Sequence, residues 1–244
     1  MKRIHLIMPM GGKGSRFAEH GFEFPKPLIP INGKPFFYWS AMSIAKFINV
    51  IDITFVVLQE HVERFNIDKE IRLYFPRANI KIIPDVLNGA VLTCREGLSC
   101  IHDDSPIVFN DCDHMFRCRP FEQFIDSEDS IDGALLTFES NEEKYSFLRI
   151  DDCGNVCETV EKQAISNQAI CGCYYFDSKN IFISSSEQYL KECQYKEFFV
   201  SGVYNVLTRE GKIVKAFQTD FHVPFGVPEE YKIAKDSPYF QELE

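Results

Sequence analysis

A glycine-rich loop with cationic side chains follows the first apolar run of the chain. Residues 9–17 read PMGGKGSRF, and the three glycines allow sharp backbone bends that turn several N–H groups to one side. Such a loop forms a cradle for phosphate oxygens, and Lys13 and Arg16 add positive charge to it. A tight turn with solvated cations is the alternative for the loop taken alone.

Further along the chain, a lysine lies between two prolines. Because Pro25 and Pro27 restrict the backbone around Lys26, its ammonium group can be directed at a ligand with little loss of entropy. A lysine held beside a triphosphate neutralises charge that develops on the α-phosphoryl oxygens in the transition state. The loop and the lysine together indicate chemistry on a phosphate group.

Two carboxylates follow an apolar run in the segment IVFNDCDHMF, residues 107–116. Alternate residues of extended backbone face the same side, so Asp111 and Asp113 can share a hard cation such as Mg²⁺, which prefers oxygen ligands. Open α/β sheets bind ligands beyond the carboxyl ends of their strands, where this segment is expected to lie. A polar turn is the alternative for the pair taken alone.

The two-part motif GGKGSRF followed by PKPLIPINGKP resembles the signature of the sugar-phosphate nucleotidyltransferases, also called nucleotide-sugar pyrophosphorylases. It differs from a P-loop, which needs G-x-x-x-x-G-K-[ST], and from the Rossmann G-x-G-x-x-G motif. The similarity extends over nearly the whole chain. It implies a Rossmann-like α/β fold in which the nucleotide lies across the first loop.

The resemblance also implies roles for individual residues. Lys26 and Arg16 match catalytic positions, and Asp113 matches the metal ligand, with Asp111 as a further candidate ligand. The implied nucleotide-binding residues are Met10, Gly11, Gly12, Lys13, Gly14, Ser15, Asn88, Gly89 and Asp111, and the implied acceptor-binding residues are Glu161, Lys162 and Gly172. From the residues alone, Asn88-Gly89 also fits a helix cap, and Glu161-Lys162 also fits a solvated surface pair.

The sequence departs from the family pattern at two positions related to the metal. Cys112 replaces the glycine before the metal-binding aspartate, and Pro224 stands where the family commonly has a second aspartate. Asp220 and His222 are the nearby candidates for a second ligand, and His222 also fits a structural or surface imidazole.

Short β-rich runs alternate with amphipathic stretches in the first half, which is the pattern of βαβ units that form a parallel sheet. Strands are expected at residues 4–8, 53–58, 80–83, 107–110, 133–138 and 171–176, and helices at 35–47, 90–100, 121–125, 201–209 and 228–235. Residues 145–150 and 156–160, joined by a turn, predict an inserted antiparallel hairpin.

We therefore expect a three-layer α/β/α fold of Rossmann-like character, with a mixed, mostly parallel central sheet. Residues 1–244 are expected to form one domain, because no linker or repeat interrupts them. Residues 1–130 would supply the nucleotide-binding half, and residues 131–244 the acceptor-binding half.

Composition argues against several kinds of partner. The net charge is -10, and no basic run is interleaved with aromatic residues, which argues against nucleic acid. No apolar stretch reaches the roughly 18 residues that span a bilayer, and the N-terminal residues fit a first strand better than a signal peptide. The nine cysteines, an odd number without a CxxC pair, indicate reduced cytoplasmic thiols and argue against disulfides or a zinc site. Composition does not distinguish a monomer from a homo-oligomer.

These observations predict a magnesium-dependent nucleotidyltransferase that joins a nucleotide to a small phosphorylated acceptor and releases pyrophosphate. A phosphate monoester has its second pKa near about 6 and is largely ionised at neutral pH, so its attack needs no general base. The resemblance to short cytidylyltransferases favours CTP, with uridylyl and thymidylyl transfer left open. The acceptor would be a sugar phosphate or a precursor of capsule or cell-surface polysaccharide, such as phosphocholine or phosphoglutamine.

Two other functions fit parts of the sequence. A D-x-D segment at a strand end also resembles glycosyltransferases of a related fold, which hold a nucleotide-sugar through a divalent ion, although Lys26 between its prolines argues against that class. The third possibility is a non-catalytic module that binds a nucleotide-sugar. Release of pyrophosphate distinguishes the transferase from both.

Overall fold

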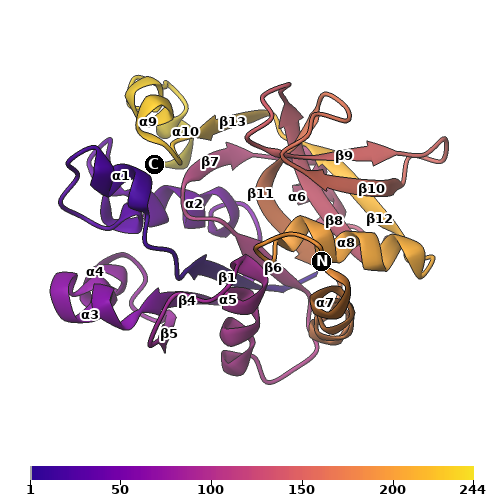
Figure 1. Ribbon diagram of the computed structural model, residues 1–244, viewed down its shortest axis with the longest axis horizontal. Helices are drawn as coiled ribbons and strands as arrows, with labels where there is room; N and C mark the ends of the chain where they lie inside the picture. Colours follow the sequence, from indigo (N-terminus) through magenta and orange to yellow (C-terminus); the bar gives the residue numbers. More distant parts are fainter. Residues whose placement is uncertain (1) are drawn as a thin grey trace.

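The computed structural model describes residues 2–244 and is built around a nine-stranded mixed sheet (Figure 1). Its strands are β1 (Ile4–Met10), β4 (Val50–Leu58), β5 (Asn79–Ile83), β6 (Ile107–Asn110), β8 (Gly133–Glu139), β9 (Ser146–Ile150), β10 (Val156–Glu161), β11 (Gln168–Phe176) and β12 (Val214–Gln218). Two small sheets pair β2 (Pro30–Ile31) with β3 (Lys34–Pro35) and β7 (His114–Arg117) with β13 (Phe221–Pro224).

Helices lie on both faces of the central sheet. They are α1 (Ser15–Glu19), α2 (Phe36–Ala45), α3 (Gln59–Phe65), α4 (Ile67–Tyr74), α5 (Ala90–Gly97), α6 (Arg119–Asp126), α7 (Lys179–Glu192), α8 (Val200–Arg209), α9 (Pro228–Ala234) and α10 (Phe240–Leu243), with 3₁₀ turns at Lys26–Leu28 and Leu98–Cys100. No helix among residues 2–244 has both the length and the apolar character needed to cross a membrane.

The first half of the chain forms the parallel part of the sheet. Strands β5, β4, β1 and β6 lie side by side in that order, and each neighbouring pair is parallel. Strand β1 is buried along nearly its whole length, as expected for a strand covered on both faces. Because β1 and β6 are parallel neighbours, the loops that follow them begin at the same edge of the sheet.

Each face of the sheet has its own apolar core. Leu6, Met8, Phe55 and Val57 pack on one face, where α2, α4 and α6 contribute side chains such as Phe37, Ile71 and Phe121. Ile7 and Val56 point to the other face, where α5, α7 and α8 contribute side chains such as Val91, Phe182 and Val203. The period-2 alternation of the strands thus builds a three-layer α/β/α fold, and the predicted fold class is confirmed.

The second half extends the sheet with antiparallel strands. Strand β11 pairs antiparallel with β6 on one side and with β8 on the other. Strands β9 and β10 form an antiparallel hairpin (Figure 1) whose turn is closed by the Asp151 N–H, which donates to the Asn155 carbonyl at 2.8 Å. The predicted inserted hairpin is confirmed.

A third apolar cluster attaches the C-terminal helices to the N-terminal loop. Phe36 of α2 packs against Phe225 with ring centroids 4.6 Å apart, and Trp39 packs against Phe240 at 4.7 Å. Phe17 of α1 belongs to the same cluster. Residues from the two ends of the chain are therefore held together behind the glycine-rich loop.

Several elements were not expected from the sequence. Helix α7 is the longest of these, and it contains three consecutive serines that weaken its apolar periodicity. Its start is fixed by Ser178, whose hydroxyl oxygen accepts a hydrogen bond from the Ile181 N–H at 3.1 Å. Helices α3 and α4 and the strands β7, β12 and β13 were also not expected.

Candidate active site

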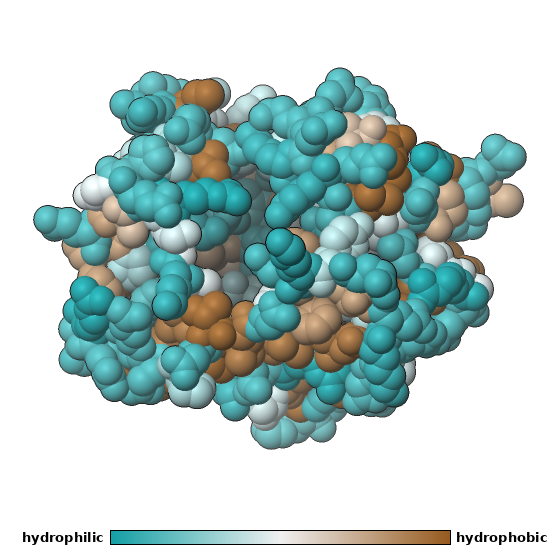
Figure 2. Space-filling view, viewed as in Figure 1, coloured by the Kyte–Doolittle hydropathy of each residue, from teal (hydrophilic) through white to brown (hydrophobic). Residues whose placement is uncertain are grey.

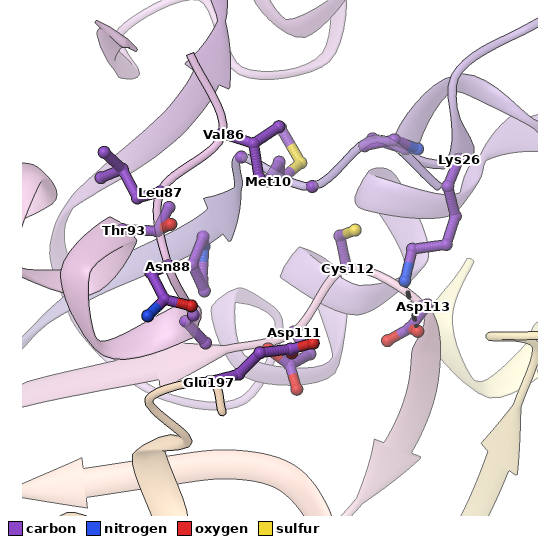
Figure 3. Close-up of a pocket in the computed structure, with 16 residues that line it drawn as sticks. Met10, Lys26, Val86, Leu87, Asn88, Thr93, Asp111, Cys112, Asp113 and Glu197 are labelled. Atoms are coloured by element: carbon purple, nitrogen blue, oxygen red, sulfur yellow. Dashed lines mark hydrogen bonds and ion pairs between the residues drawn. The ribbon is translucent and has the colours of Figure 1, made fainter. Parts of the chain in front are cut away.

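Two cavities meet at the edge of the sheet where β1 and β6 end. The first has a volume of about 540 Å³ and the second about 220 Å³, and Lys26, Asp111 and Asp113 line both. Figure 2 shows the hollow near the middle of this face of the molecule, and Figure 3 shows the residues of the first cavity. Two ligands that occupy these cavities would therefore meet at one lysine and two carboxylates.

Lys26 and Asp113 form an ion pair at this junction (Figure 3). The Lys26 Nζ donates to the Asp113 Oδ2 at 2.8 Å, and 27% and 25% of the two side chains remain exposed. Burial opposes the charge on Lys26, but the Asp113 carboxylate more than compensates and raises the lysine's pKa. Burial also opposes the charge on Asp113, yet Lys26 holds the pKa of this carboxyl below its usual value. Both groups are therefore charged at neutral pH.

Asp111 lies in a less favourable environment. Burial, together with the charge of Asp113, raises the pKa of Asp111 to about 7. The Asp111 N–H donates to the Gly172 carbonyl at 2.9 Å, and a Cβ on Gly172 would lie 2.7 Å from the Asp111 Oδ2. The glycine of β11 thus leaves room for this carboxylate, and the two aspartates crowd negative charge at the junction.

Glycines give the first cavity its shape. A Cβ on Gly11 would lie 2.8 Å from the Ile83 side chain and 3.0 Å from Thr93. Gly89 has a φ of 100°, precedes the first residue of α5 and lines the cavity beside Asn88. The two interpretations of Asn88-Gly89, a helix start and a cavity wall, are therefore compatible.

The second cavity has a wall of neutral imidazoles. The Asn110 Nδ2 donates to the Ser40 carbonyl at 2.9 Å, so the Asn110 Oδ1 accepts from the His114 Nε2 at 3.1 Å. The other His114 nitrogen then accepts from the His222 Nε2 at 3.2 Å, and the His222 Nδ1 is buried without a partner. Burial lowers the pKa of His114 to about 4 and also lowers that of His222.

Comparison with known proteins decides which family this geometry belongs to. A family model described as nucleotidyl transferase matches residues 5–223. The chain belongs to the nucleotidyl transferase family. The glycine-rich loop and the segment around Asp113 both lie within the matched residues.

Solved structures share the fold of this nucleotidyl transferase. A nucleoside-diphosphate-sugar pyrophosphorylase from Vibrio cholerae superposes with a TM-score of 0.80 at 22% identity, over 95% of this chain and 100% of that one. An inositol-1-phosphate CTP transferase from T. maritima gives 0.76 at 14% identity, over 99% and 94%. A UDP-glucose pyrophosphorylase bound to UDP-glucose gives 0.75 at 19% identity, over 99% and 100%.

Residues of the glycine-rich loop of this transferase line three different cavities. Met10, Gly11 and Gly12 line the first cavity, and Arg16 lines the second. The remaining loop residues, Lys13, Gly14 and Ser15, line a separate groove of about 440 Å³ beside α3. Gly14 has a φ of 63°, and a Cβ there would lie 2.8 Å from the Lys26 Cβ, so this glycine lets the loop pack against the lysine.

The predicted acceptor-binding residues are also separated. Gly172 lines the second cavity, and Glu161 lies behind it, where its carboxylate accepts from the Ser146 Oγ at 2.6 Å. Burial raises the pKa of Glu161. Lys162 lines neither of the two joined cavities, and its Nζ lies 5.2 Å from the centre of the Phe199 ring.

Asp220 is not brought to the junction. In the β7–β13 pair, Pro224 lies opposite His114, while Phe221 lies opposite Arg117 at the other end of the ladder. The Asp220 carboxylate accepts from the Arg119 N–H at 2.7 Å and pairs with the Arg119 guanidinium at 3.2 Å. No group of three or more His, Cys, Asp or Glu side chains within residues 2–244 is arranged to hold a metal ion.

Sequence reasoning missed two sets of site residues. The first is Lys144, Tyr145 and Glu230, where Glu230 accepts from both of the others at 2.8 Å. The second is Glu197, which comes from the loop between α7 and α8 and lines the first cavity. Lys144, Tyr145 and Glu197 have no local signature, because each reaches its cavity only through distant pairing of the chain.

Proposed function

We propose that this protein transfers a nucleoside monophosphate from an NTP to the phosphate of a small acceptor and releases pyrophosphate. The observation that carries this proposal is the meeting of two cavities at Lys26, Asp111 and Asp113. A transferase must hold two anionic substrates in contact, and a binding module needs only one cavity. Membership of the nucleotidyl transferase family supports the same reaction.

The side chains at the junction suit an in-line attack on the α-phosphorus. Lys26 carries its charge where the α-phosphate and the acceptor phosphate would meet, and Arg16 carries a second charge to the acceptor side. The acceptor phosphate is largely ionised at neutral pH. The neutral His114 and His222 are not needed as bases, and their hydrogen bonds hold the wall of the acceptor cavity.

Asp111 and Asp113 fit a magnesium site. Mg²⁺ is usually held by one or two carboxylates, with substrate phosphates and water as the other ligands. Burial, together with the charge of Asp113, raises the pKa of Asp111, and a divalent cation would relieve the repulsion between the two carboxylates. When bound, Mg²⁺ supplies positive charge beside the phosphoryl oxygens. The His222 Nε2 is engaged in the hydrogen bond with His114 and is not available to such an ion.

CTP is the proposed nucleotide, and the acceptor is proposed to be a sugar phosphate or a phosphorylated precursor of a capsule or surface polysaccharide. A structural neighbour named as an inositol-1-phosphate CTP transferase supports the choice of CTP. Neighbours named for UDP-glucose and for thymidylyl transfer make UTP and dTTP the main competitors. The nine free cysteines support a reducing compartment such as the cytoplasm.

The decisive experiment is an assay of pyrophosphate release. The four common NTPs and dTTP are crossed with phosphorylated sugars, phosphocholine and phosphorylated amides, with Mg²⁺ or with a chelator. We expect one nucleotide and one acceptor to support release, and Lys26→Ala to lower kcat about 10²-fold or more, as loss of one charge-stabilising group does elsewhere.

Lys46→Ala is the matched control, because Lys46 is exposed on the surface after α2. It should leave the rate unchanged. A wild-type protein that binds a nucleotide-sugar but releases no pyrophosphate with any pair would refute the proposal and favour a glycosyltransferase or a binding module.

A further inference from the structure

The loop between α7 and α8 is fixed against the start of α5. The Phe198 N–H donates to the Asn88 carbonyl at 3.4 Å, and the Val91 N–H donates to the Phe198 carbonyl at 3.1 Å. The approach is close, because a Cβ on Gly89 would lie 2.3 Å from the Phe198 nitrogen. The backbone beside Phe198 therefore has a defined position at the wall of the first cavity.

Glu197 precedes this anchor and lines the first cavity. Within residues 2–244, the Glu197 carboxylate forms no hydrogen bond or ion pair, and only its backbone carbonyl accepts a weak contact, from the Cys193 Sγ at 4.0 Å. In the view of Figure 3, Glu197 is drawn at the lower edge of the cavity next to Asp111, with Asn88 to the left and the ion pair of Lys26 with Asp113 to the right. An exposed, unpaired carboxylate thus lies at the wall of the first cavity.

The chemistry of a carboxylate restricts what it can contact there. An ionised carboxylate only accepts hydrogen bonds, and it repels the phosphates of a nucleotide. Lys26 marks the phosphate end of the cavity, and Asn88 marks the end proposed for the base. The part of a nucleotide between its base and its phosphates is the ribose, whose hydroxyl groups are donors.

We propose that Glu197 accepts a hydrogen bond from the ribose 2′-hydroxyl and makes this enzyme select ribonucleotides over deoxyribonucleotides. Glu197 is therefore a specificity-determining residue from the second half of the chain. A carboxylate suits this role because a hydrogen bond to a charged group contributes more binding free energy than one between neutral groups. The same contact serves any ribonucleotide base, since the ribose is common to all.

The test compares matched nucleotide pairs, CTP with dCTP, UTP with dUTP, ATP with dATP and GTP with dGTP. For the pair that the wild type uses, we expect kcat/KM to be about 10- to 100-fold higher with the ribonucleotide, the factor that one charge-assisted hydrogen bond gives. Glu197→Ala should remove most of that preference by weakening the ribonucleotide alone. Glu197→Gln, which keeps an acceptor oxygen, should retain part of it.

Lys196→Ala controls for disturbance of the loop, because Lys196 is the exposed neighbour and does not line the cavity. It should keep the wild-type preference. A wild type that prefers dTTP or any other deoxyribonucleotide would overturn the inference. So would a Glu197→Ala variant that weakens both members of a pair equally, or one that changes only the choice between CTP and UTP, which would point to a base contact.

Because the inference rests on the proposed function, calorimetric binding of each pair in Mg²⁺ provides a readout independent of turnover. Ribonucleotide preference in binding that depends on Glu197 supports the inference even where the wild type releases no pyrophosphate. Turnover without any preference between CTP and dCTP would contradict the inference and leave the proposed function intact.

Discussion

Among single residues, the junction of the two cavities contains one ion pair whose charges stabilise each other and one carboxylate whose charge is unfavourable. Lys26 and Asp113 stabilise each other, whereas Asp111 is held beside a second carboxylate. Such an arrangement is common at functional sites, where groups are placed for a ligand at the expense of stability of the free protein.

Asp111→Asn is predicted to stabilise the free protein in a pH-dependent way. The pKa of Asp111 is 3.8 in a model compound and about 7 in the folded protein, so the folded state binds more protons between these values. Wild-type stability therefore falls as pH rises through this window, and Asn lacks this effect. The variant should gain about 1–3 kcal/mol at pH 8 and close to nothing at pH 4.

Urea unfolding at the two pH values, without Mg²⁺ or nucleotide, measures this difference. Asp151→Asn is the control, since its carboxyl has a lowered pKa caused first by the hydrogen bond from the Asn155 N–H. An equal gain for Asp111→Asn at both pH values would contradict the predicted titration of Asp111.

At the scale of elements, the site depends on close approach between segments that lie far apart in the sequence. Gly89 and Phe198 bring the start of α5 against the loop before α8, and Gly172 brings β11 against the end of β6. Without a side chain, glycine permits both the left-handed backbone and the contact.

Gly89→Ala is predicted to destabilise the protein more than a glycine-to-alanine substitution whose only cost is backbone strain. Its new Cβ would lie 2.3 Å from the Phe198 nitrogen, and its φ is 100°. We expect a loss of about 3 kcal/mol or more, from strain and overpacking together. Gly211→Ala, with a φ of 74° and nothing within 4 Å, should lose about 1–2 kcal/mol. Chemical denaturation measures the stability of both variants. Equal losses would mean that the loop before α8 moves away from the new Cβ at little cost in free energy.

The sequence was most informative where a motif lies within one short segment. The surroundings of Lys26 and of Asp113 could be interpreted before the fold was known, because each chemical group has its positioning residues next to it. Glu197 and Lys144 could not, since their roles arise from pairing between distant loops. Helix α7 was missed because two of its four buried side chains, Ser185 and Ser186, are polar, so its helical spacing does not appear as an apolar period.

At the scale of the whole molecule, the C-terminal helices hold the N-terminal loop from behind. The cluster around Trp39 joins α2 to α10, so both ends of the chain contribute to one apolar core. This core also reaches the site, because the Phe225 N–H donates to the Asp113 carbonyl at 2.9 Å.

Phe240→Ala is predicted to destabilise this core. Phe240 is fully buried, with its ring centre 4.7 Å from that of Trp39, and loss of a buried Phe costs about 3–5 kcal/mol. Since Trp39 is the single tryptophan, its fluorescence reports both the local change and global unfolding. Ile233→Ala, at a side chain that is 78% exposed, should change stability by less than about 0.5 kcal/mol. Matching stabilities for the two variants would show that α10 is not part of the core.

Each half of the chain contributes residues to both cavities, and this affects how such proteins can be recombined. Glu197, from the second half, lines the cavity proposed for the nucleotide, and Arg16, from the first half, lines the cavity proposed for the acceptor. A chimera that joins the first half of one relative to the second half of another therefore inherits neither cavity intact. Exchange of substrate preference between relatives requires that the glycine-rich loop and the loop before α8 be transplanted as a set.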